Sequence, residues 1–488
     1  MNAAKLYGRV YTPHYLVKLM LDYVGYVGSE NILCKHIIDN SCGDGAFLVE
    51  IVRRYCNAHI SAGGSIEDLR QNLSTFIHGI EIDSQECEAC KQNRNSVAEV
   101  FGLTNVCWDV VCEDTLTTSA YNGKMDYVVG NPPYVRVHNL SDSTYRHVKK
   151  YTFAQGGMTD LFVVFFEIGF RMMSPAGKMC LITPNSWLNS VAGSVLRSYI
   201  AKNKPLNGVI DLEHHQAFKA TTYSLISRFS QTQCEQIEYN VFDEKTLGKC
   251  YRCHIALDEM NIGGLFYLAD SQTLQRLREI RMVPHPQNVR VKNGFATLAD
   301  GVFIGDWNFS GMTIDVVKSS TGKWSKCLFP YSNSKPIPLC EIEQQFPDVY
   351  EYYMSKKEAL CKDTTPPEPT PQQDLFGVQC PKGMQNTTWH LFGRTQAIND
   401  VAKDKIAINS VIKDRSSIKL SFVPKGKGVY GGLYMLSDVS FEKIRELVSS
   451  EEYISYIATL KNYKSGGYYT CTAKDVELYL NYKLQNNE

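Results

Sequence analysis

Short apolar segments alternate with helix-like segments between residues 37 and 129, and no other feature of the chain constrains its fold as strongly. Repeated strand, helix and strand units build a mostly parallel sheet that is covered by helices on both faces. The sequence therefore predicts an α/β fold with a doubly wound, Rossmann-like sheet. Its predicted strands are Ile37–Asn40, Phe76–Ile82, Val106–Cys112, Tyr127–Val129, Lys178–Thr183, Leu206–Leu212 and Tyr223–Ser230, and its helices include Phe47–Tyr55, Glu86–Val97 and Asp160–Met173.

The alternation weakens after about residue 245, which indicates a second domain in a chain of 488 residues. We expect domains at residues 1–245 and 246–488. The second contains strand-like runs and a helical end from Glu442 to Leu460, and it is predicted to be mixed α+β. Prolines cluster within residues 361–377, which predicts a loop or an insertion. The strand-like runs are Lys405–Val411 and Ile418–Val423.

The chain contains 16 cysteines, and cysteine is a common zinc ligand. In a large chain without an export signal, most of them are expected to be reduced and buried. Two pairs have CxxC spacing, Cys87 with Cys90 and Cys250 with Cys253. A structural zinc site takes four ligands, and no His pair at zinc-finger spacing completes either pair. Plain packing is therefore favoured over zinc, and no metal is expected.

The start of the chain, MNAAKLYGRVYTPHY, lacks the basic, apolar and small-residue segments of a signal peptide. The longest apolar stretch, Leu161–Ile168, includes Glu167 and is far shorter than the ~20 residues that a membrane span requires. We therefore expect a soluble, cytoplasmic protein with no membrane partner.

A glycine-containing loop follows the first predicted strand in the stretch HIIDNSCGDGAF. The strand ends in Asp39, and Gly43 and Gly45 lead into a helix. Glycines at this edge of a parallel sheet let the backbone approach a nucleotide closely. Leu48 breaks the dinucleotide fingerprint, and the lysine of a P-loop is missing. Cofactor binding and a tight structural turn both remain open.

Acidic residues follow the next two strands. Glu81 lies at the tip of the second strand, where a carboxylate typically accepts hydrogen bonds from ribose hydroxyls. Capping of the next helix is the alternative role, and Asp83 is better placed for it. Asp114 follows the third strand and is suited to accept from an adenine amino group. With the glycine loop, these residues predict a cradle for an adenosine.

The fourth strand ends in DYVVGNPPY, which is the most specific motif in the chain. Each proline restricts its own backbone and that of its predecessor, so the Asn131 amide and the Pro132 carbonyl become rigidly held acceptors. Two acceptors that meet one planar NH₂ group make its nitrogen more nucleophilic. Tyr134, after Pro133, offers a flat face to the ring that carries the amine. A turn without a catalytic role is the alternative.

These motifs, in this order, resemble the gamma class of S-adenosylmethionine-dependent DNA adenine N6-methyltransferases of restriction-modification systems. A YTP segment precedes the glycine loop, NPPY follows it, and a large region comes last. The resemblance is strongest over residues 8–235. It implies catalytic roles for Asn131, Pro132, Pro133 and Tyr134, and a cofactor site formed by Tyr11, Thr12, Pro13, Asp39, Ser41, Gly43, Gly45, Glu81, Ile82, Asp114, Thr115 and Asn131.

In that family the N-terminal segment contacts the methionine part of the cofactor. Thr12 and Pro13 would also suit a helix cap followed by a first helical turn, so both roles remain open. The segment from Gly177 to Leu188 resembles the strand and loop that flank the target-base pocket. Phe218 matches the aromatic residue that stacks on the flipped adenine opposite Tyr134, with ordinary core packing as its alternative. The histidines at 214 and 215 are expected to be loop residues and not catalysts.

Net charge gives no signal for nucleic acid, because 51 basic residues balance 51 acidic ones. The distribution is uneven: residues 1–100 carry 9 basic and 12 acidic side chains, whereas residues 391–430 carry 8 and 3. A basic segment is where a phosphate backbone would bind. Lys413, Arg415, Lys425 and Lys427 are the predicted DNA-binding residues, with a solvated surface as the alternative.

The predicted activity is methyl transfer from S-adenosylmethionine to N6 of an adenine that has rotated out of double-stranded DNA, in a bacterial or archaeal nucleoid. The region from residue 246 would recognise the target sequence. No nuclease triad of two acids and a lysine is evident, so any cognate restriction endonuclease would be a separate protein. Cytosine N4, an RNA adenine or a protein glutamine remain alternative acceptors. A DNA-binding specificity protein without catalysis is the alternative of another class.

Overall fold

The computed structural model describes residues 11–28, 30–156, 159–218, 222–283, 288–360 and 388–485. The chain forms two compact units, Met1–Arg278 and Glu279–Glu488. The predicted proline-rich loop at 361–377 lies outside the described residues.

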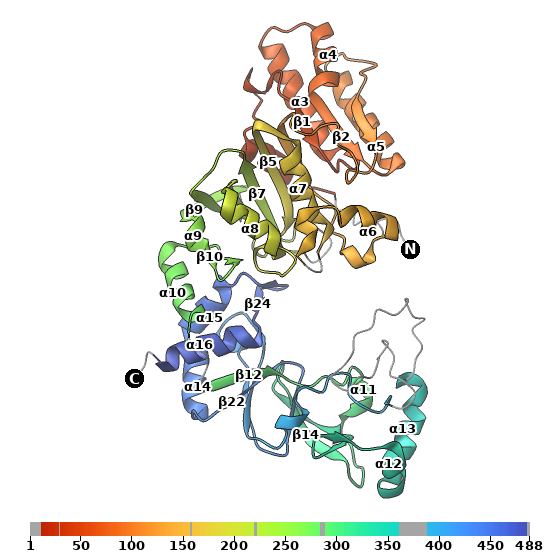
Figure 1. The fold of residues 1–488 in the computed structure, drawn as a ribbon, viewed down its shortest axis with the longest axis vertical. Helices are drawn as coiled ribbons and strands as arrows, with labels where there is room; N and C mark the ends of the chain where they lie inside the picture. Colours follow the sequence, from red (N-terminus) through yellow and green to blue (C-terminus); the bar gives the residue numbers. More distant parts are fainter. Residues whose placement is uncertain are drawn as a thin grey trace. The chain divides into compact units, whose positions relative to one another are not determined.

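A nine-stranded sheet with the order β3-β2-β1-β4-β5-β7-β6-β8-β9 forms the centre of the first unit (Figure 1). From β3 to β5 neighbouring strands are parallel, whereas β7 is antiparallel to both β5 and β6. The chain order reverses between β1 and β4, which is where open α/β sheets bind ligands. The strands are β1 Ile37–Asp39, β2 Ile77–Glu81, β3 Asp109–Cys112, β4 Met125–Gly130, β5 Met173–Pro184, β6 Leu206–Asp211, β7 Ser224–Ser230, β8 Gln236–Asp243 and β9 Gly248–Ala256.

Helices cover both faces of this sheet, so the doubly wound α/β prediction is confirmed. On one face, α2 and α3 pack against alternate strand residues such as Cys180 and Ile182. On the other face, Gly169 of α7 lies so close to β5 that an added Cβ would be 2.3 Å from the sulfur of Met179. The helices and 3₁₀ turns of this unit are α2 His14–Val24, η1 Glu30–Ile32, α3 Ala46–Ser61, α4 Ile66–Phe76, α5 Ser84–Val100, η2 Val137–Asn139, α6 Asp142–Val148, η3 Thr152–Gln155, α7 Leu161–Met172, η4 Asn185–Leu188, α8 Ser194–Asn203 and α9 Leu257–Met260.

Strand β8 ends just before the predicted domain boundary, and β9 extends the sheet beyond it. β8 is parallel to β6, and β9 pairs antiparallel with β8. These two strands are joined by a turn without a helix between them, so the strand and helix alternation does not reveal them. The compact units accordingly meet at residues 278 and 279, later than the predicted boundary at 245 and 246.

The second unit contains several small sheets, and it is mixed α+β as predicted. One four-stranded sheet has the order β12-β22-β18-β20 and another has the order β13-β15-β14-β21. A three-stranded sheet, β19-β24-β23, includes a hairpin. The strands are β12 Val289–Asn293, β13 Ile304–Gly305, β14 Thr313–Lys318, β15 Lys323–Leu328, β16 Tyr331–Ser332, β17 Lys335–Pro336, β18 Lys405–Ile408, β19 Val411–Ile412, β20 Leu420–Val423, β21 Gly428–Tyr430, β22 Leu433–Ser437, β23 Tyr463–Lys464 and β24 Tyr468–Thr470.

Aromatic side chains fill the core of the second unit. The Phe392 ring stacks on Phe295 at 4.8 Å and contacts Phe329 and Tyr331. The predicted helical end at 442–460 is two helices, because Ser450 caps a new one. None of the helices in the described parts of the chain is long and apolar enough to span a membrane. The remaining elements are β10 Asn261–Ile262, β11 Leu265–Phe266, α10 Ser271–Arg281, α11 Asp300–Phe303, α12 Leu339–Gln345, α13 Pro347–Leu360, η5 Ile398–Asp400, η6 Arg415–Ser417, α14 Phe441–Val448, α15 Glu451–Thr459 and α16 Ala473–Gln485.

Candidate functional site

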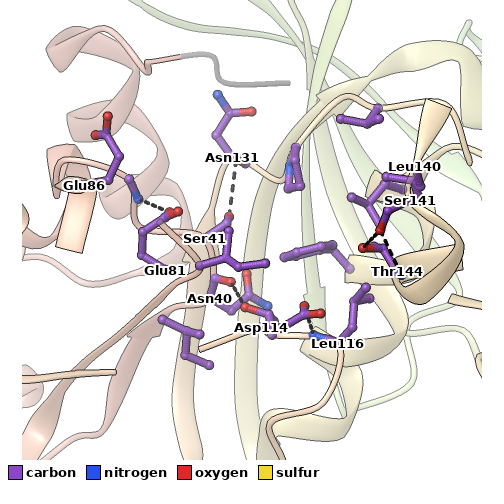
Figure 2. Close-up of a pocket in the computed structure, with 18 of the residues that line it drawn as sticks. Asn40, Ser41, Glu81, Glu86, Asp114, Leu116, Asn131, Leu140, Ser141 and Thr144 are labelled. Atoms are coloured by element: carbon purple, nitrogen blue, oxygen red, sulfur yellow. Dashed lines mark hydrogen bonds between the residues drawn. The ribbon is translucent and has the colours of Figure 1, made fainter. Parts of the chain in front are cut away.

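A pocket of about 360 Å³ opens at the carboxyl edge of the first unit's sheet. The parallel strands β1, β2, β3 and β4 all end at this edge, so the residues that follow them come together. Figure 2 shows Glu81 and Glu86 on one side, with Leu140, Ser141 and Thr144 on the opposite side. Of the residues predicted from the sequence, the pocket is lined by Tyr11, Ser41, Gly43, Glu81, Ile82, Asp114, Thr115, Asn131 and Pro133.

The two glycines of the loop have different roles. Gly43 lines the pocket, and its N–H donates to the Glu81 carboxylate at 2.9 Å. Gly45 has a φ of 90°, and a Cβ there would lie 2.7 Å from the Cys90 sulfur. Gly45 is therefore needed for the turn and for close packing against α5, and it does not line the pocket. Of the two roles left open for this loop, the tight structural turn fits Gly45. Of the two glycines, only Gly43 is placed to contact a bound cofactor.

Glu81 is held rigidly at the tip of β2. Its two oxygens accept from the N–H groups of Gly43 and Asp83, each at 2.9 Å. The Asp83 carboxylate accepts from the first turn of α5, so it is Asp83 that caps the helix. Each Glu81 oxygen still has lone-pair capacity for a second donor. A hydroxyl-bearing ligand in the pocket would meet a fixed pair of acceptors.

Asp114 and Thr115 shape the pocket beneath the strand tips. One Asp114 oxygen accepts from the N–H of Leu116 at 2.9 Å, and the other lies 3.7 Å from His147 Nδ1. The Thr115 hydroxyl donates to the carbonyl of Asn40 at 2.7 Å. These bonds tie the loop after β3 to the loop after β1, so the pocket floor is preformed.

Asp39 lies behind the glycine loop and does not line the pocket. Its carboxylate is 1% exposed and accepts from the N–H of Ser41 at 3.1 Å. A Cβ on Gly130 would lie 2.7 Å from Asp39 Oδ1, so only glycine allows β4 to approach this closely. Burial raises the pKa of Asp39 to about 7, with the neighbouring Glu81 and Asp44 adding to the rise. Its position suits ordering of the loop more than direct contact with a cofactor.

The N-terminal segment reaches the site through two residues with different contacts. Tyr11 lines the pocket, and its hydroxyl donates to Glu86 at 3.0 Å. Thr12 is 8% exposed and is not part of the pocket lining. Its hydroxyl accepts from the Asn131 side-chain amide at 3.1 Å. Pro13 is the N-cap residue of α2, and it also lies outside the pocket lining.

The NPPY loop separates the first pocket from a second one. Asn131 and Pro133 line the first, whereas Tyr134 lines a second pocket of about 300 Å³. Pro132 is buried, and the Tyr134 hydroxyl donates to the carbonyl of Ile182 at 3.3 Å. One short, stiff loop thus forms part of two adjacent cavities. The other residues of the second pocket are Arg136, Asp160, Phe162, Pro184, Asn185, Ser186, Thr222 and Tyr223.

Residues 48–218 match the model of the Eco57I restriction-modification methylase family. This match includes Glu81, the NPPY loop and Phe218. Over these residues the chain resembles that family. The predicted resemblance to methyltransferases of restriction-modification systems is therefore confirmed for residues 48–218, which are called the methylase domain below.

Curated relatives of this chain include Type II methyltransferases. M.BstVI of Geobacillus stearothermophilus is 29% identical over 238 residues, which cover 46% of this chain and 42% of that protein. M.XhoI of Xanthomonas vasicola is 24% identical over 333 residues, which cover 61% of this chain and 60% of that protein. The chain thus spans about half the length of these relatives.

Solved structures resemble the fold over nearly the whole chain. The Type IIL restriction-modification enzyme MmeI, solved in complex with DNA, has a TM-score of 0.62 at 13% identity, covering 94% of this chain and 65% of that one. The DrdV–DNA complex has a TM-score of 0.53 at 12% identity, covering 93% of this chain and 52% of that one. At these identities the likeness concerns the fold, and it places the methylase domain in a known architecture.

Phe218 of the methylase domain lies in the hydrophobic core. It is 8% exposed, and its ring meets Tyr134 edge-on, with centroids 6.1 Å apart and planes at 80°. A base stacked between two rings needs them parallel and about 7 Å apart, which is two van der Waals contacts. The position of Phe218 matches the core-packing alternative. Tyr223 lines the second pocket, although the sequence predicts it only as the start of a strand.

The sequence motifs also missed one wall of the first pocket. Asn139, Leu140, Ser141 and Thr144 come from η2 and α6, after the NPPY loop. They form no recognisable motif, since their role depends on how this segment folds back over the sheet edge. Helix α7 adds Leu161 and Phe165, which the apolar pattern of a buried helix conceals.

The four predicted DNA-binding cations lie in two places in the second unit. Lys413 and Arg415 are exposed beside the sheet that contains β19, and the Lys413 ammonium lies 5.8 Å from the Tyr468 ring centre. Lys425 and Lys427 lie between β20 and β21, and Lys427 pairs with Asp315 at 2.9 Å. One predicted cation is therefore already neutralised by an acid.

The CxxC pairs occupy ordinary positions. Cys87 and Cys90 are buried on α5, and the Cys90 thiol lies 3.9 Å from Cys42. Cys250 and Cys253 lie on β9. Across the described residues, no three His, Cys, Asp or Glu side chains gather as metal ligands would.

Proposed function

We propose that this chain is a site-specific DNA methyltransferase that transfers a methyl group from S-adenosylmethionine to N6 of an adenine. The observation that supports this best is the NPPY loop, which borders two adjacent pockets. A methyl-transfer site needs a donor on one side of a catalytic group and an acceptor on the other. Two pockets divided by one loop meet that need.

The first pocket suits the cofactor. Its volume is in the range of pockets for small molecules, roughly 300–1,000 Å³. Glu81 would accept from the ribose hydroxyls and Asp114 from the adenine amino group, while Leu161 and Phe165 provide apolar contact. When bound, S-adenosylmethionine supplies an electrophilic methyl group on a sulfonium. The residues proposed to hold it are those predicted from the sequence that line this pocket, together with Asn40, Glu86 and the α6 wall.

The second pocket would receive the acceptor base. The Asn131 amide oxygen and the Pro132 carbonyl would each accept one hydrogen of the exocyclic amine, so its lone pair is kept for the methyl group. Tyr134 would stack on the base. Catalysis then consists of placing the amine in line and supporting the positive charge that develops on its nitrogen.

An adenine amine is paired inside duplex DNA, so the base must rotate out at a cost of a few kcal/mol. Base stacking in the second pocket and phosphate contacts elsewhere would offset this cost. We propose that the second unit, Glu279–Glu488, selects the target sequence, with Lys413 and Arg415 among its phosphate contacts. We also propose a cognate restriction endonuclease as a partner in the same system.

The test uses the full chain with S-adenosylmethionine that carries a labelled methyl group. Unmethylated DNA of mixed sequence, structured RNA and a bacterial protein extract are offered separately, and the DNA product is digested to nucleosides. We expect the label in N6-methyladenine, and far less of it with Asn131→Ala. Label in N4-methylcytosine, in RNA or in glutamine would show that the acceptor is not adenine in DNA. Sequence-specific DNA binding without methyl transfer would show that the chain is a DNA-binding specificity protein and not an enzyme.

A further inference from the structure

Asn131 is held from two directions at the edge of the first pocket. The Ser41 hydroxyl donates to its backbone carbonyl at 3.4 Å, as Figure 2 shows. Its side-chain nitrogen donates to the Thr12 hydroxyl at 3.1 Å, across 119 residues of sequence. The first bond restrains the main chain and the second restrains the amide, so the whole residue has a defined orientation.

The Thr12 hydroxyl is not placed to cap a helix or to contact a ligand in the first pocket. Pro13, not Thr12, is the N-cap of α2, and no side chain caps this helix. Thr12 is also outside the lining of the pocket proposed for the cofactor, although its neighbour Tyr11 lines it. The contact that distinguishes this hydroxyl is the Asn131 amide.

Thr12 is also rigidly placed. Pro13 restricts the backbone of the residue before it. The Pro13 carbonyl accepts from the N–H groups of Leu16 and Val17, both of which are fully buried. The next turn is anchored as well, because the Tyr15 hydroxyl lies 2.7 Å from His215 Nε2. A rigid partner can hold the amide more firmly than a mobile one.

The orientation of this amide matters because its two ends have opposite hydrogen-bonding roles. The oxygen accepts, whereas the NH₂ group donates and would face the hydrogens of an acceptor amine. With the nitrogen bonded to Thr12, the oxygen is the end turned away from Thr12. An amide without this bond would sample other rotamers, and few of them would meet the acceptor.

We propose that Thr12 is a positioning residue, which holds the Asn131 amide with its oxygen directed at the acceptor amine. This inference rests on the proposed function, since it assumes that Asn131 binds that amine. It gives Thr12 a role in the chemical step in place of a contact with the cofactor.

A double-mutant cycle tests the inference in the full-length chain. The variants are Thr12→Val, which removes the hydroxyl at similar size, Thr12→Ser, which keeps it, Asn131→Ala and the double variant Thr12→Val with Asn131→Ala. Thr75→Val is the matched control, because Thr75 is exposed on α4 and lines neither pocket. Each protein is measured for its single-turnover rate at saturating DNA and cofactor, and for cofactor affinity by calorimetry.

We expect Thr12→Val to lower the single-turnover rate about 10- to 100-fold, the range that small misplacements of a catalytic group produce. Its cofactor Kd should stay within about 2-fold of wild type, because Thr12 lies outside the pocket lining, and a change of that size is under half a kcal/mol. Thr12→Ser should recover most of the rate, and Thr75→Val should match wild type. In the Asn131→Ala background, Thr12→Val should have no further effect on transfer.

Two results would overturn the role of Thr12. One is a weaker cofactor Kd with an unchanged rate at saturation, which would make Thr12 a cofactor contact. The other is an equal loss from Thr12→Val with and without Asn131, which would make it independent of the amide. A wild-type protein that transfers no methyl group to DNA would instead overturn the proposed function and the inference together.

Discussion

Asp39 in the first unit and Asp400 in the second are both buried, and their surroundings differ in kind. Asp39 accepts from one backbone N–H and lies near the carboxylates of Glu81 and Asp44, and its burial raises its pKa to about 7. Asp400 accepts from Lys292, Lys403 and Tyr434. Burial alone would raise its pKa, but these hydrogen bonds outweigh it and lower the pKa to about 2.

The buried Asp39 carboxylate therefore lowers the stability of the folded protein, whereas the buried Asp400 carboxylate raises it. A buried charge is stabilising only where partners replace the lost water. In the second unit, two lysines and a tyrosine do so. At the sheet edge of the first unit, the buried Asp39 carboxylate has a single backbone donor and lies near Glu81 and Asp44, which is typical of sites shaped for a ligand. Residues at this edge should therefore affect function more than folding, and paired or core residues should do the reverse.

The largest stability effect should come from Phe218, which lies in the core of the first unit. Phe218→Ala should lower the free energy of unfolding by about 3–5 kcal/mol, as for other buried aromatic residues. Tyr223→Ala should instead weaken binding of the target base by about 1–3 kcal/mol, the usual value of a stacking ring. Chemical denaturation and binding to a duplex with a mismatched target adenine would measure both. A stable Phe218→Ala protein with poor base binding would show that Phe218 stacks on the target base opposite Tyr134.

Asn131→Ala should reduce methyl transfer by roughly 10²- to 10³-fold, as the loss of one preorganised hydrogen-bonding group does. Its free energy of unfolding should change little, because Asn131 lies at the edge and not in the core. Its cofactor affinity should fall far less than its rate, because Asn131 is one of many residues that line the first pocket. Single-turnover rates and calorimetry provide the test. Rapid turnover by this variant at saturating DNA would contradict the mechanism.

Asp400→Asn should lower the stability of the second unit by about 2 kcal/mol, since it removes hydrogen bonds to charged groups. Because the pKa of Asp400 is lowered on folding, its contribution is present above a pH of about 4 and is lost as the pH falls towards 2. Denaturation curves between pH 2 and 7 should show this loss in the wild type and a flatter profile in the variant. An identical profile would show that the lysines do not stabilise Asp400.

Among the exposed cations, Lys413 and Arg415 should matter more than Lys425 and Lys427. Replacing the first two with Gln should flatten the dependence of log K on log salt, by up to about 0.9 for each phosphate that is no longer neutralised. Lys427 already pairs with Asp315, so the second pair should change the slope less. Filter binding from 50 to 200 mM salt compares the two. Equal slopes for both variants would move the DNA-binding surface elsewhere.

The smallest effect should come from Asp39→Asn. Because the pKa of Asp39 is raised on folding, the first unit should lose stability as the pH rises from about 4 to about 7, opposite to the effect of Asp400. The variant should remove this slope and be at least as stable as the wild type at pH 8, because a neutral amide places no charge in this buried position. A variant less stable than wild type at pH 8 would show that the ionised carboxylate is compensated.

The sequence alone is sufficient to predict those features of this protein that depend on neighbouring residues along the chain. The strands before Asp39, Glu81, Asp114 and Asn131 are visible as short apolar runs, and parallel pairing brings their carboxyl ends together whatever the details of packing. The NPPY motif likewise restricts its own backbone through its prolines. These features predicted the α/β fold and nearly half of one pocket lining.

The tertiary structure decided what depends on contacts between distant segments. Asp39 and Gly45 belong to the predicted cofactor motif, yet packing against Gly130 and Cys90 places them behind the pocket. Thr12 meets Asn131 and not the pocket because α2 packs on the sheet. The α6 wall, Tyr223 and the ion pair of Lys427 carry no sequence signal, since a side chain's neighbours are set by the way separate elements fold together.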